Sequence, residues 1–484
     1  MSRLPILFLM ILNIVKAEIP ISEELIISLA GKDNPTSLKI QAKSIQSQLE
    51  KGLDLEGYST NLTLSGLHKT SKEAPYLAFA ETLRKNQNIM ITAKKKFPLG
   101  LTLNGGIGYD HRRSLFSNSI NNFHTFVGEA GVELNLLKNI FGHIDRARIH
   151  RNSLKEDYAK ILKNIELVHF KTQLRRWYWE LMKNHFSLDI SNSLLKTAKS
   201  QLKQAKKRFN NSVADRSEVA RYQSQVAGRK GQILYLRFLQ EQLFTQLKDR
   251  LPSLTGKKLI LAEKSRDQMI VNALSCVDSI KKRREIPIKD TFYDEMSSVI
   301  FEKGKFDEKL AKSHSGPDLN LRYNVSSKGV GLNQSDSFDD GFGSKRIGHE
   351  VYLGLTISLG QNSKANELKK IKLAKIHSIS ELSRYKNMIA TKHEFMQRSI
   401  VHLIDVMQQQ KISNGAQKIR VNAVKKKYRQ GRVSVTDMIV DEDALLQSEL
   451  DILDTQLVIV ENLLDYFSTF PQYLCPFNLF ASKR

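Results

Sequence analysis

The sequence predicts a mainly α-helical protein with β-strands, organised as two structural repeats that each join strands to a long coiled-coil helical hairpin. One observation is a seam of apolar residues near the C-terminus that alternate at spacings of four and three, which is typical of a coiled coil. The seam consists of Leu446, Leu450, Leu453, Leu457, Val460, Leu464 and Phe467. Long helices of this kind need lateral partners that bury their apolar stripe.

The duplication is indicated by two landmarks that recur in the same order. Turn segments at residues 210–217 and 429–436 each lie between two long helical patterns, and they are separated by about 220 residues. Alternating strand patterns at residues 132–136 and 355–359 recur at nearly the same separation. Two landmarks at one separation indicate a repeated unit rather than a chance match.

The N-terminus predicts export. Arg3 precedes a short apolar run at residues 4–15, and Val15-Lys16-Ala17 places small residues where a signal peptidase cuts. Residues 1–17 are therefore expected to be a signal peptide, with a buried N-terminal helix as the alternative. No later apolar run is long enough for a transmembrane helix, so strands would have to make any membrane crossing.

The composition leaves several partner classes open. The chain has 484 residues, 41% of them hydrophobic, which is enough for a core, and a formal net charge of +25. Such a charge suits nucleic acid, anionic lipid or acidic ligands, although export weakens the nucleic-acid interpretation. An oxidising compartment would permit one disulfide between Cys276 and Cys475, and two unpaired thiols are the alternative.

The first repeat is expected at residues 18–256 and the second at residues 291–470, joined by an irregular, basic connecting segment at 257–290. Asn34-Pro35 separates two helices at the start of the first repeat, and the Pro98-Leu99-Gly100 turn predicts a strand hairpin within residues 89–109. The other expected elements are barrel strands at about 60–67, 125–137, 317–326 and 348–359, helical hairpins at about 141–251 and 363–470, and an irregular tail at 471–484.

The strands alternate apolar and polar side chains, so each would have one apolar and one polar face. This pattern is typical of a transmembrane barrel strand and also of a soluble sandwich strand. Interleaving with helices this long favours the barrel. No nucleotide-binding loop, zinc-spaced Cys/His set or nucleophile elbow is present, so the sequence predicts no enzyme, no cofactor and no metal site.

Short sequence motifs at the two turns resemble those of the TolC-type outer membrane efflux proteins. Tyr428-x-x-Gly431 followed by Asp437 resembles the tip motif of that family, and Phe209-x-x-Ser212 with Glu218 resembles its first-repeat copy. Two further motifs resemble the strand-to-helix transitions of that family. They are Leu134-Asn135-Leu136-Leu137 leading into Phe141-Gly142, and Gly354 to Leu359.

The resemblance implies a homotrimer in the outer membrane of a Gram-negative-type bacterium. Three chains of four strands would close a twelve-stranded β-barrel, which a periplasmic α-helical barrel would continue. The assembly would be a passive conduit, the exit duct of a tripartite efflux or type I secretion system. It would dock to a periplasmic adaptor (membrane fusion) protein and an inner-membrane transporter, and it would involve no nucleic acid.

The resemblance also implies functional residues at the tips. Asp437 would contribute to an acidic ring at the periplasmic aperture, Tyr428 would be a gating contact, and Glu218 occupies the matching acidic position of the first tip. The sequence departs from the family pattern in having Val440 and Val433 at two aperture positions, the latter with Arg432 one residue earlier. Helix-end packing and charge compensation are the alternative roles for Tyr428 and Asp437.

The turn residues themselves would receive the adaptor. They are Gly431 and Ser434 at the second tip and Ser212 and Asp215 at the first. Gly431 can adopt positive φ and close a helix, and Ser434 or Thr436 can cap the next one.

Two other functional classes fit parts of the sequence. A periplasmic coiled-coil adaptor would have a helical hairpin, but usually one, whereas two occur here. A secreted, basic coiled-coil protein that binds anionic polymers would explain the charge but not the repeated strands. The sequence leaves open the exported substrate, the transporter and adaptor, and whether the basic excess faces the lumen or the exterior.

Overall fold

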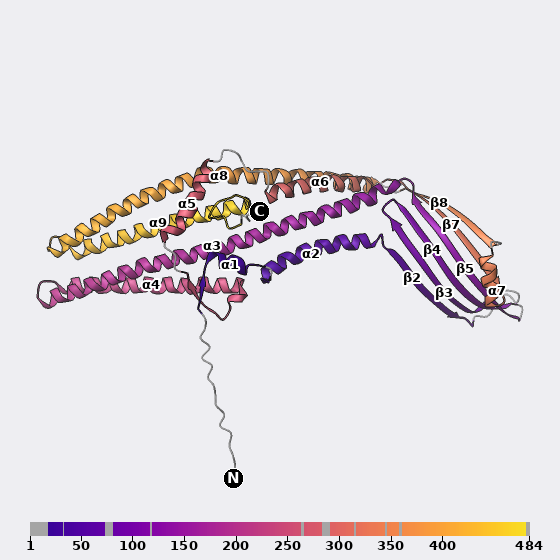
Figure 1. The fold of residues 1–484 in the computed structure, drawn as a ribbon, viewed down its shortest axis with the longest axis horizontal. Helices are drawn as coiled ribbons and strands as arrows, with labels where there is room; N and C mark the ends of the chain where they lie inside the picture. The colour runs from indigo at the N-terminus through magenta and orange to yellow at the C-terminus, as the bar shows by residue number, and fades with distance from the viewer. Residues whose placement is uncertain are drawn as a thin grey trace, which may run out of the picture. The chain divides into compact units, whose positions relative to one another are not determined.

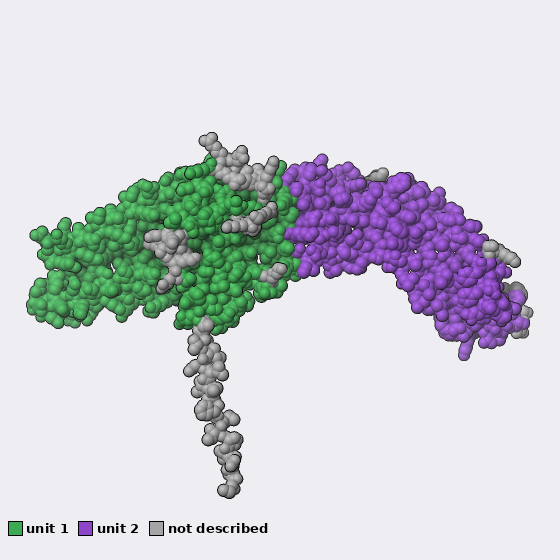
Figure 2. Space-filling view, in the orientation of Figure 1, with its two compact units in different colours: residues 1–43, 161–295, 384–484 green, residues 44–160, 296–383 purple. Residues whose placement is uncertain are grey.

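The computed structural model describes residues 18–31, 33–72, 81–116, 119–262, 266–282, 291–313, 316–343, 346–357 and 361–480. The expected signal peptide at 1–17 lies outside these residues. The chain forms two compact units, residues 1–43, 161–295 and 384–484 in the first and residues 44–160 and 296–383 in the second (Figure 2). Each unit takes residues from both sequence repeats, so the compact units do not coincide with the repeats.

The first unit is mainly helical (Figure 1). Its elements are β1 (Glu18–Ile21), α1 (Glu23–Leu29), the start of α2 (Pro35–Glu56), most of α3 (His143–Asn210), α4 (Arg216–Arg250), the short helix η2 (Pro252–Leu254), β6 (Lys258–Leu261), α5 (Arg266–Lys282), the start of α6 (Phe292–Ser313), most of α8 (Gln361–Arg429) and α9 (Val435–Thr469). β1 and β6 pair in parallel.

The segment at 257–290 is more regular than the sequence analysis expected, because it contains β6 and α5. The buried side chains of α5 are Ala273, Cys276, Val277 and Ile280, at the three- and four-residue spacings of a helix face. This amphipathic pattern stabilises a helix in a segment whose basic residues suggested only a connection.

A buried charged residue joins the two ends of the first unit. Arg175 on α3 is fully buried, and its Nε donates a hydrogen bond to Glu23 at the start of α1. Trp179 Nε1 donates to the same carboxylate at 3.1 Å. Arg175 Nη2 donates to the carbonyl oxygen of Phe477 at 2.7 Å, and the guanidinium lies 4.8 Å from the centroid of that ring. A buried guanidinium needs partners of this kind, so the contacts fix α1 and the C-terminal segment against α3.

Cys276 on α5 and Cys475 in the C-terminal segment form a disulfide, with their Cα atoms 5.6 Å apart. The described part of the expected tail, residues 471–480, contains no helix or strand. Covalent attachment to α5 holds this irregular segment in place.

The second unit contains an antiparallel sheet with the order β2-β3-β4-β5-β7-β8 (Figure 1). Its strands are β2 (Thr60–Thr70), β3 (Thr82–Phe97), β4 (Leu101–Phe116), β5 (Ser119–Asn135), β7 (Asp318–Gly331) and β8 (Ile347–Thr356). The other elements of this unit are the rest of α2, η1 (Ile140–Gly142), the start of α3, the rest of α6, α7 (Gln334–Phe342) and the start of α8.

The described residues place six strands in one sheet, two more than the four barrel strands expected per chain. The hairpin expected within residues 89–109 is β3 and β4, and it lies between β2 and β5. Both strands are 16 residues long and pair along nearly their whole length, so they belong to the sheet as fully as their neighbours.

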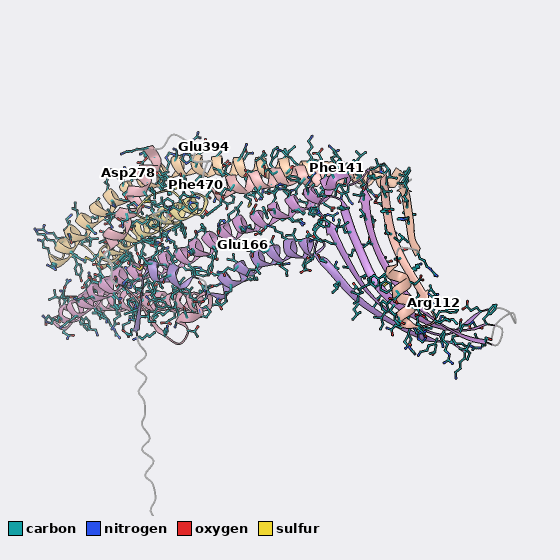
Figure 3. All side chains as sticks on the ribbon, turned by 45° about the vertical axis from the view of Figure 1, so that its right-hand side comes forward. Arg112, Phe141, Glu166, Asp278, Glu394 and Phe470 are labelled. Carbon is teal, nitrogen blue, oxygen red and sulfur yellow. A yellow bond between two sulfur atoms is a disulfide. The ribbon has the colours of Figure 1, made fainter. Side chains whose placement is uncertain are left out.

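The transition from sheet to helix is built around Phe141 (Figure 3), where the backbone adopts positive φ at Phe141 and Gly142. A Cβ atom at Gly142 would lie 1.8 Å from the carbonyl oxygen of Pro98, so only glycine fits against the turn between β3 and β4. The β3–β4 hairpin therefore packs directly on the transition between β5 and α3.

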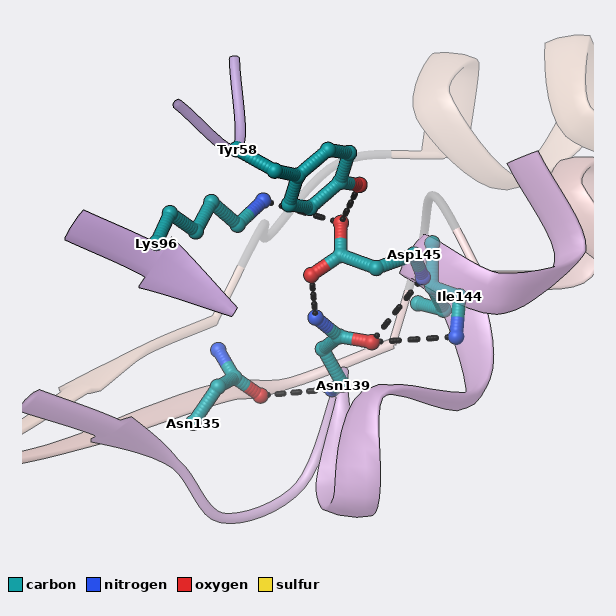
Figure 4. Close-up of polar contacts among 6 residues, drawn as sticks. All are labelled: Tyr58, Lys96, Asn135, Asn139, Ile144 and Asp145. Atoms are coloured by element: carbon teal, nitrogen blue, oxygen red, sulfur yellow. Dashed lines mark hydrogen bonds and ion pairs between the residues drawn. The ribbon is translucent and has the colours of Figure 1, made fainter. Parts of the chain in front are cut away.

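Asp145, in the first turn of α3, connects this transition to its neighbours (Figure 4). Its carboxylate accepts hydrogen bonds from Tyr58 Oη at 2.9 Å, Lys96 Nζ at 2.8 Å and Asn139 Nδ2 at 2.6 Å. Burial alone would raise the pKa of Asp145. The hydrogen bonds from Lys96, Asn139 and Tyr58, together with the positive charge of Lys96, outweigh burial and hold that pKa below its ordinary value.

Replacing Asp145 with asparagine is predicted to destabilise the protein at pH 7 by about 1–3 kcal/mol, because it removes a buried, charge-assisted acceptor. A lowered folded-state pKa stabilises above the ordinary carboxyl pKa and loses that contribution as pH falls through the folded value. The difference between wild type and variant should therefore shrink below about pH 3.9. Unfolding in detergent at several pH values measures it.

Asp157→Asn is the matched control, because this carboxylate lies on the same helix with a side chain that is 48% exposed. It should change stability by less than about 0.5 kcal/mol. Equal effects of the two variants would contradict the role assigned to Asp145.

Candidate functional site at the hairpin tips

The two helical hairpins end in the same backbone motif. After α3, the amide of Val213 donates to the carbonyl of Arg208 at 2.8 Å, and Ser212 has a φ of 58°. After α8, the amide of Arg432 donates to the carbonyl of Lys427 at 3.0 Å, and the φ of the intervening glycine is 74°. Both are Schellman closures, which require a residue in the left-handed region.

Gly431 is that residue at the second tip, as the sequence analysis expected. Ser212 takes the same conformation at the first tip, where a serine carries a steric cost of about 1–2 kcal/mol. The alignment of these two residues in sequence thus corresponds to one shared geometry.

The return helix of the second tip begins with a capping box. The amide of Asp437 donates to Ser434 Oγ at 3.2 Å, and the amide of Ser434 donates to Asp437 Oδ2 at 3.3 Å. The Ser434 hydroxyl also donates to that carboxylate oxygen at 2.6 Å. Asp437 is exposed and compensates the N-terminal charge of α9, the alternative role that the sequence analysis left open.

The first tip is capped differently. Asp215 occupies the N-cap position of α4 in an extended conformation, but its side chain makes no capping bond. Its Oδ2 atom accepts a hydrogen bond from Ser217 Oγ at 3.1 Å instead. The two tips therefore share a backbone but present different side-chain chemistry.

Tyr428 and Glu218 come together, and they join one hairpin to the other. The Tyr428 hydroxyl donates to the Glu218 carboxylate, and Arg208 pairs with the same carboxylate at 3.3 Å. The Arg208 guanidinium also lies 5.2 Å from the centroid of the Tyr428 ring. Burial, and then the bond to Glu218, raise the pKa of Tyr428, so its hydroxyl remains a proton donor well above neutral pH.

An apolar cluster surrounds this contact. Tyr222 on α4 is fully buried and meets the Tyr428 ring edge-on, with centroids 6.3 Å apart. The cluster consists of Ala205, Tyr222, Tyr428, Val435 and Met438, with Leu202, Val219, Val424 and Ile439 packed around it. It contains residues of α3, α4, α8 and α9, so all four helices are held together near the tips.

A second layer of polar contacts joins α4 to α9. Arg221 donates to Thr436 Oγ1, and Arg229 pairs with Asp443. These residues, with Gly228, line a cavity of about 510 Å³. This layer was not predicted from the sequence, where its signal is two arginines eight residues apart on α4 and an acidic run in α9.

The remaining acidic residues of that run are also paired. Glu442 accepts a hydrogen bond from Gln201 Nε2 at 2.7 Å and pairs with Lys425 at 3.3 Å. Asp441 pairs with Arg420 at 2.8 Å. Asp441 and Glu442 are also buried, which distinguishes them from the exposed Asp437.

Arg432 and Val440 are exposed, and neither lies in the apolar cluster. Among the described residues, no group of three or more His, Cys, Asp or Glu could hold a metal ion. No described helix combines the length and the apolar composition that a membrane span requires.

The sequence matches no protein-family model and no curated protein sequence. Solved structures that resemble the chain over most of its length include those of CusC, VceC and CmeC. CusC, for which transmembrane channel formation is described, has 11% identity and a TM-score of 0.65, with 93% of this chain and 92% of CusC covered.

VceC, an outer membrane protein of Vibrio cholerae, has 13% identity and a TM-score of 0.61, with 92% of this chain and 95% of VceC covered. CmeC, an outer membrane channel of Campylobacter jejuni, has 12% identity and a TM-score of 0.62, with 96% and 87% covered. The chain therefore has the fold of these outer membrane channels, and the resemblance to TolC-type proteins is confirmed at the level of the fold.

Proposed function

We propose that this protein is a TolC-type outer membrane channel, the exit duct of a tripartite efflux or type I secretion system. Three copies would form a passive conduit that docks to a periplasmic adaptor and an inner-membrane transporter. The observation that carries the proposal is the likeness to CusC, which covers 93% of this chain and 92% of CusC. A match over nearly both whole chains supports a shared architecture rather than one shared domain.

The sheet supports a location in the outer membrane. One of its faces exposes large apolar side chains in the single chain, among them Leu64 on β2 and Val351 and Leu353 on β8. Side chains of this kind are costly in water and favourable in lipid. A conduit in this position needs no catalytic group.

The hairpin tips would be the gate. Tyr428, Glu218 and Arg208 hold the two hairpins together, so their contacts describe a closed arrangement that separation of the hairpins would open. Asp437 would point to the pore in the trimer and contribute one carboxylate per copy to an acidic ring, with Arg432 beside it. Such a ring favours cations.

Adaptor docking is assigned to the exposed turns. Gly431 and Ser434 would contact the adaptor at the second tip, and Ser212 and Asp215 at the first. The two tips differ in capping chemistry, so an adaptor hairpin would distinguish them.

The trimer is tested by the mass of unboiled protein extracted in detergent from isolated outer membranes. A species of about three chain masses that forms conducting pores in planar bilayers is the expected result. A soluble single chain in the periplasmic fraction would refute the channel and favour the periplasmic adaptor instead.

The gate is tested by Tyr428→Phe, which removes the hydroxyl and keeps the ring contact with Tyr222, and by Glu218→Gln. A hydrogen bond to a charged group contributes about 1.5–3 kcal/mol, so either variant should shift the closed-to-open equilibrium toward open by about ten- to a hundred-fold. Conductance of single pores in planar bilayers measures the open probability.

Tyr235→Phe and Glu241→Gln are the controls, because both residues are exposed on α4 and lie away from the tip contacts. They should conduct as the wild type does. The double variant should add little to Glu218→Gln alone, since both substitutions remove the bond between Tyr428 and Glu218. Fully additive effects would show that the two residues act separately.

A further inference from the structure

The sheet of the second unit has two open edges. Among the described residues, β2 pairs only with β3, and β8 pairs only with β7. Every residue of β2 is exposed, and nearly every residue of β8. Unpaired backbone groups along strands this long are a template for pairing with another chain.

The strand register gives the sheet one apolar and one polar face. The apolar face includes Leu62 and Leu64 on β2, Ile89 and Ile91 on β3, Leu103 and Ile107 on β4, Val132 and Leu134 on β5, Leu321 and Tyr323 on β7, and Val351 and Leu353 on β8. The opposite face includes Thr63, Ser65, Asn88, Thr92, Asn104, Asp110, Glu129, Glu133, Asn320, Asn324 and Glu350. Apolar side chains of this face extend across β3 and β4 as across the other strands. Lys95 of β3 lies among them, and α7 packs on this face against Tyr109 and Phe126.

The height of the apolar face fits a bilayer. One row across the sheet runs through Phe97, Leu101 and Leu134, and another runs through Ile89 and Tyr109. Eight residues of β3 separate the rows, which is about 27 Å along the strand. A strand tilt of about 40° reduces this to about 20 Å, close to the apolar band of about 25 Å in outer membrane barrels.

Polar residues border the band at the end away from α3. Arg112 lies there on β4 (Figure 3), and His111 and His124 stack with ring centroids 4.5 Å apart. The β3–β4 hairpin therefore spans the whole apolar band, from the transition at Gly142 to this polar border. A hairpin of that length and patterning is part of the membrane wall rather than a loop outside it.

The directions of the strands allow copies of the chain to join. All neighbouring strands are antiparallel, so β2 and β8 run in opposite directions. When copies are arranged in a ring, β8 of one copy lies antiparallel to β2 of the next. The described strands of one chain are fewer than the eight of the smallest membrane barrels, so a single copy cannot close.

We infer that the trimer closes an eighteen-stranded barrel, to which each copy contributes its six described strands. In this barrel, β8 of each copy pairs with β2 of the next. The number of copies rests on the proposed function, and the number of strands per copy rests on the sheet. Barrel diameter grows roughly linearly with strand number, so this wall is about 1.5 times wider than a twelve-stranded one. Barrels of 16–18 strands enclose an aqueous channel, which the polar face of this sheet would line.

The test is an electron cryo-microscopy map of the detergent-solubilised protein, with the number of chains taken from its native mass. Three chains and an eighteen-stranded wall are expected. Three chains with twelve strands in the wall, and β3 and β4 folded elsewhere, would overturn the inference and leave the channel function standing. A different number of chains, or a soluble monomer, would overturn the proposed trimer and the eighteen strands with it.

A deletion of residues 82–116 also tests the number of strands in the barrel. It removes β3 and β4 and keeps β2 antiparallel to β5, with Leu64 and Gly128 on one face, so the barrel should narrow to twelve strands. The matched control replaces residues 333–343, which include α7, with an Asn-Gly turn and should keep eighteen strands. If the deletion does not fold, the map of the wild type decides alone.

Discussion

Unsatisfied backbone groups at both edges of an apolar-faced sheet are the constraint on which this structure depends. A strand edge exposed to lipid leaves amide and carbonyl groups without partners, at several kcal/mol each. The chain meets the constraint within the sheet by pairing every interior strand. In the proposed barrel, other copies would pair the edges and lipid would cover the apolar face, so assembly and membrane insertion would be coupled.

At the hairpin tips, too, a buried polar group requires a partner on another element. The Tyr428 hydroxyl is mostly buried, so it requires an acceptor, and Glu218 on the other hairpin supplies one. Arg208 balances the carboxylate and covers the tyrosine ring. In the proposed gate, the closed arrangement would be held by these polar contacts together with the apolar cluster that surrounds them.

Local features could be predicted from the sequence because they depend on nearby residues. The long helices follow from runs without proline, and the closure after α8 follows from Gly431, which is the residue best suited to positive φ. The β3–β4 hairpin also follows from its turn and alternation, yet the resemblance implied only four strands. The pattern of a family describes only the elements that its members share, so it does not predict an additional pair of strands.

Contacts between distant helices could not be predicted in the same way. Whether Arg229 meets Asp443, or Arg221 meets Thr436, depends on the axial register of α4 against α9, which packing over many turns sets. The acidic residues at 441–443 are each paired within the chain, with partners on other helices that their spacing in the sequence does not indicate. Asp437 is exposed because the cap that it forms places it at the outside of the first turn.

The charge of the polar sheet face bears on what the proposed barrel would select. The chain has a formal net charge of +25, and this face has acidic residues beside its basic ones, although Lys94 and Lys96 follow each other on it. Arg112 pairs with Asp110 at 2.5 Å, and Arg322 lies 3.7 Å from Glu133 on the neighbouring strand. Paired charges of opposite sign cancel at distances beyond a Debye length of about 8–10 Å, which is short compared with a wide lumen. Where its charges are paired, the barrel wall would therefore discriminate weakly by charge. Selection would fall to the proposed aperture, where the exposed carboxylate of Asp437 would lie close to a passing ion.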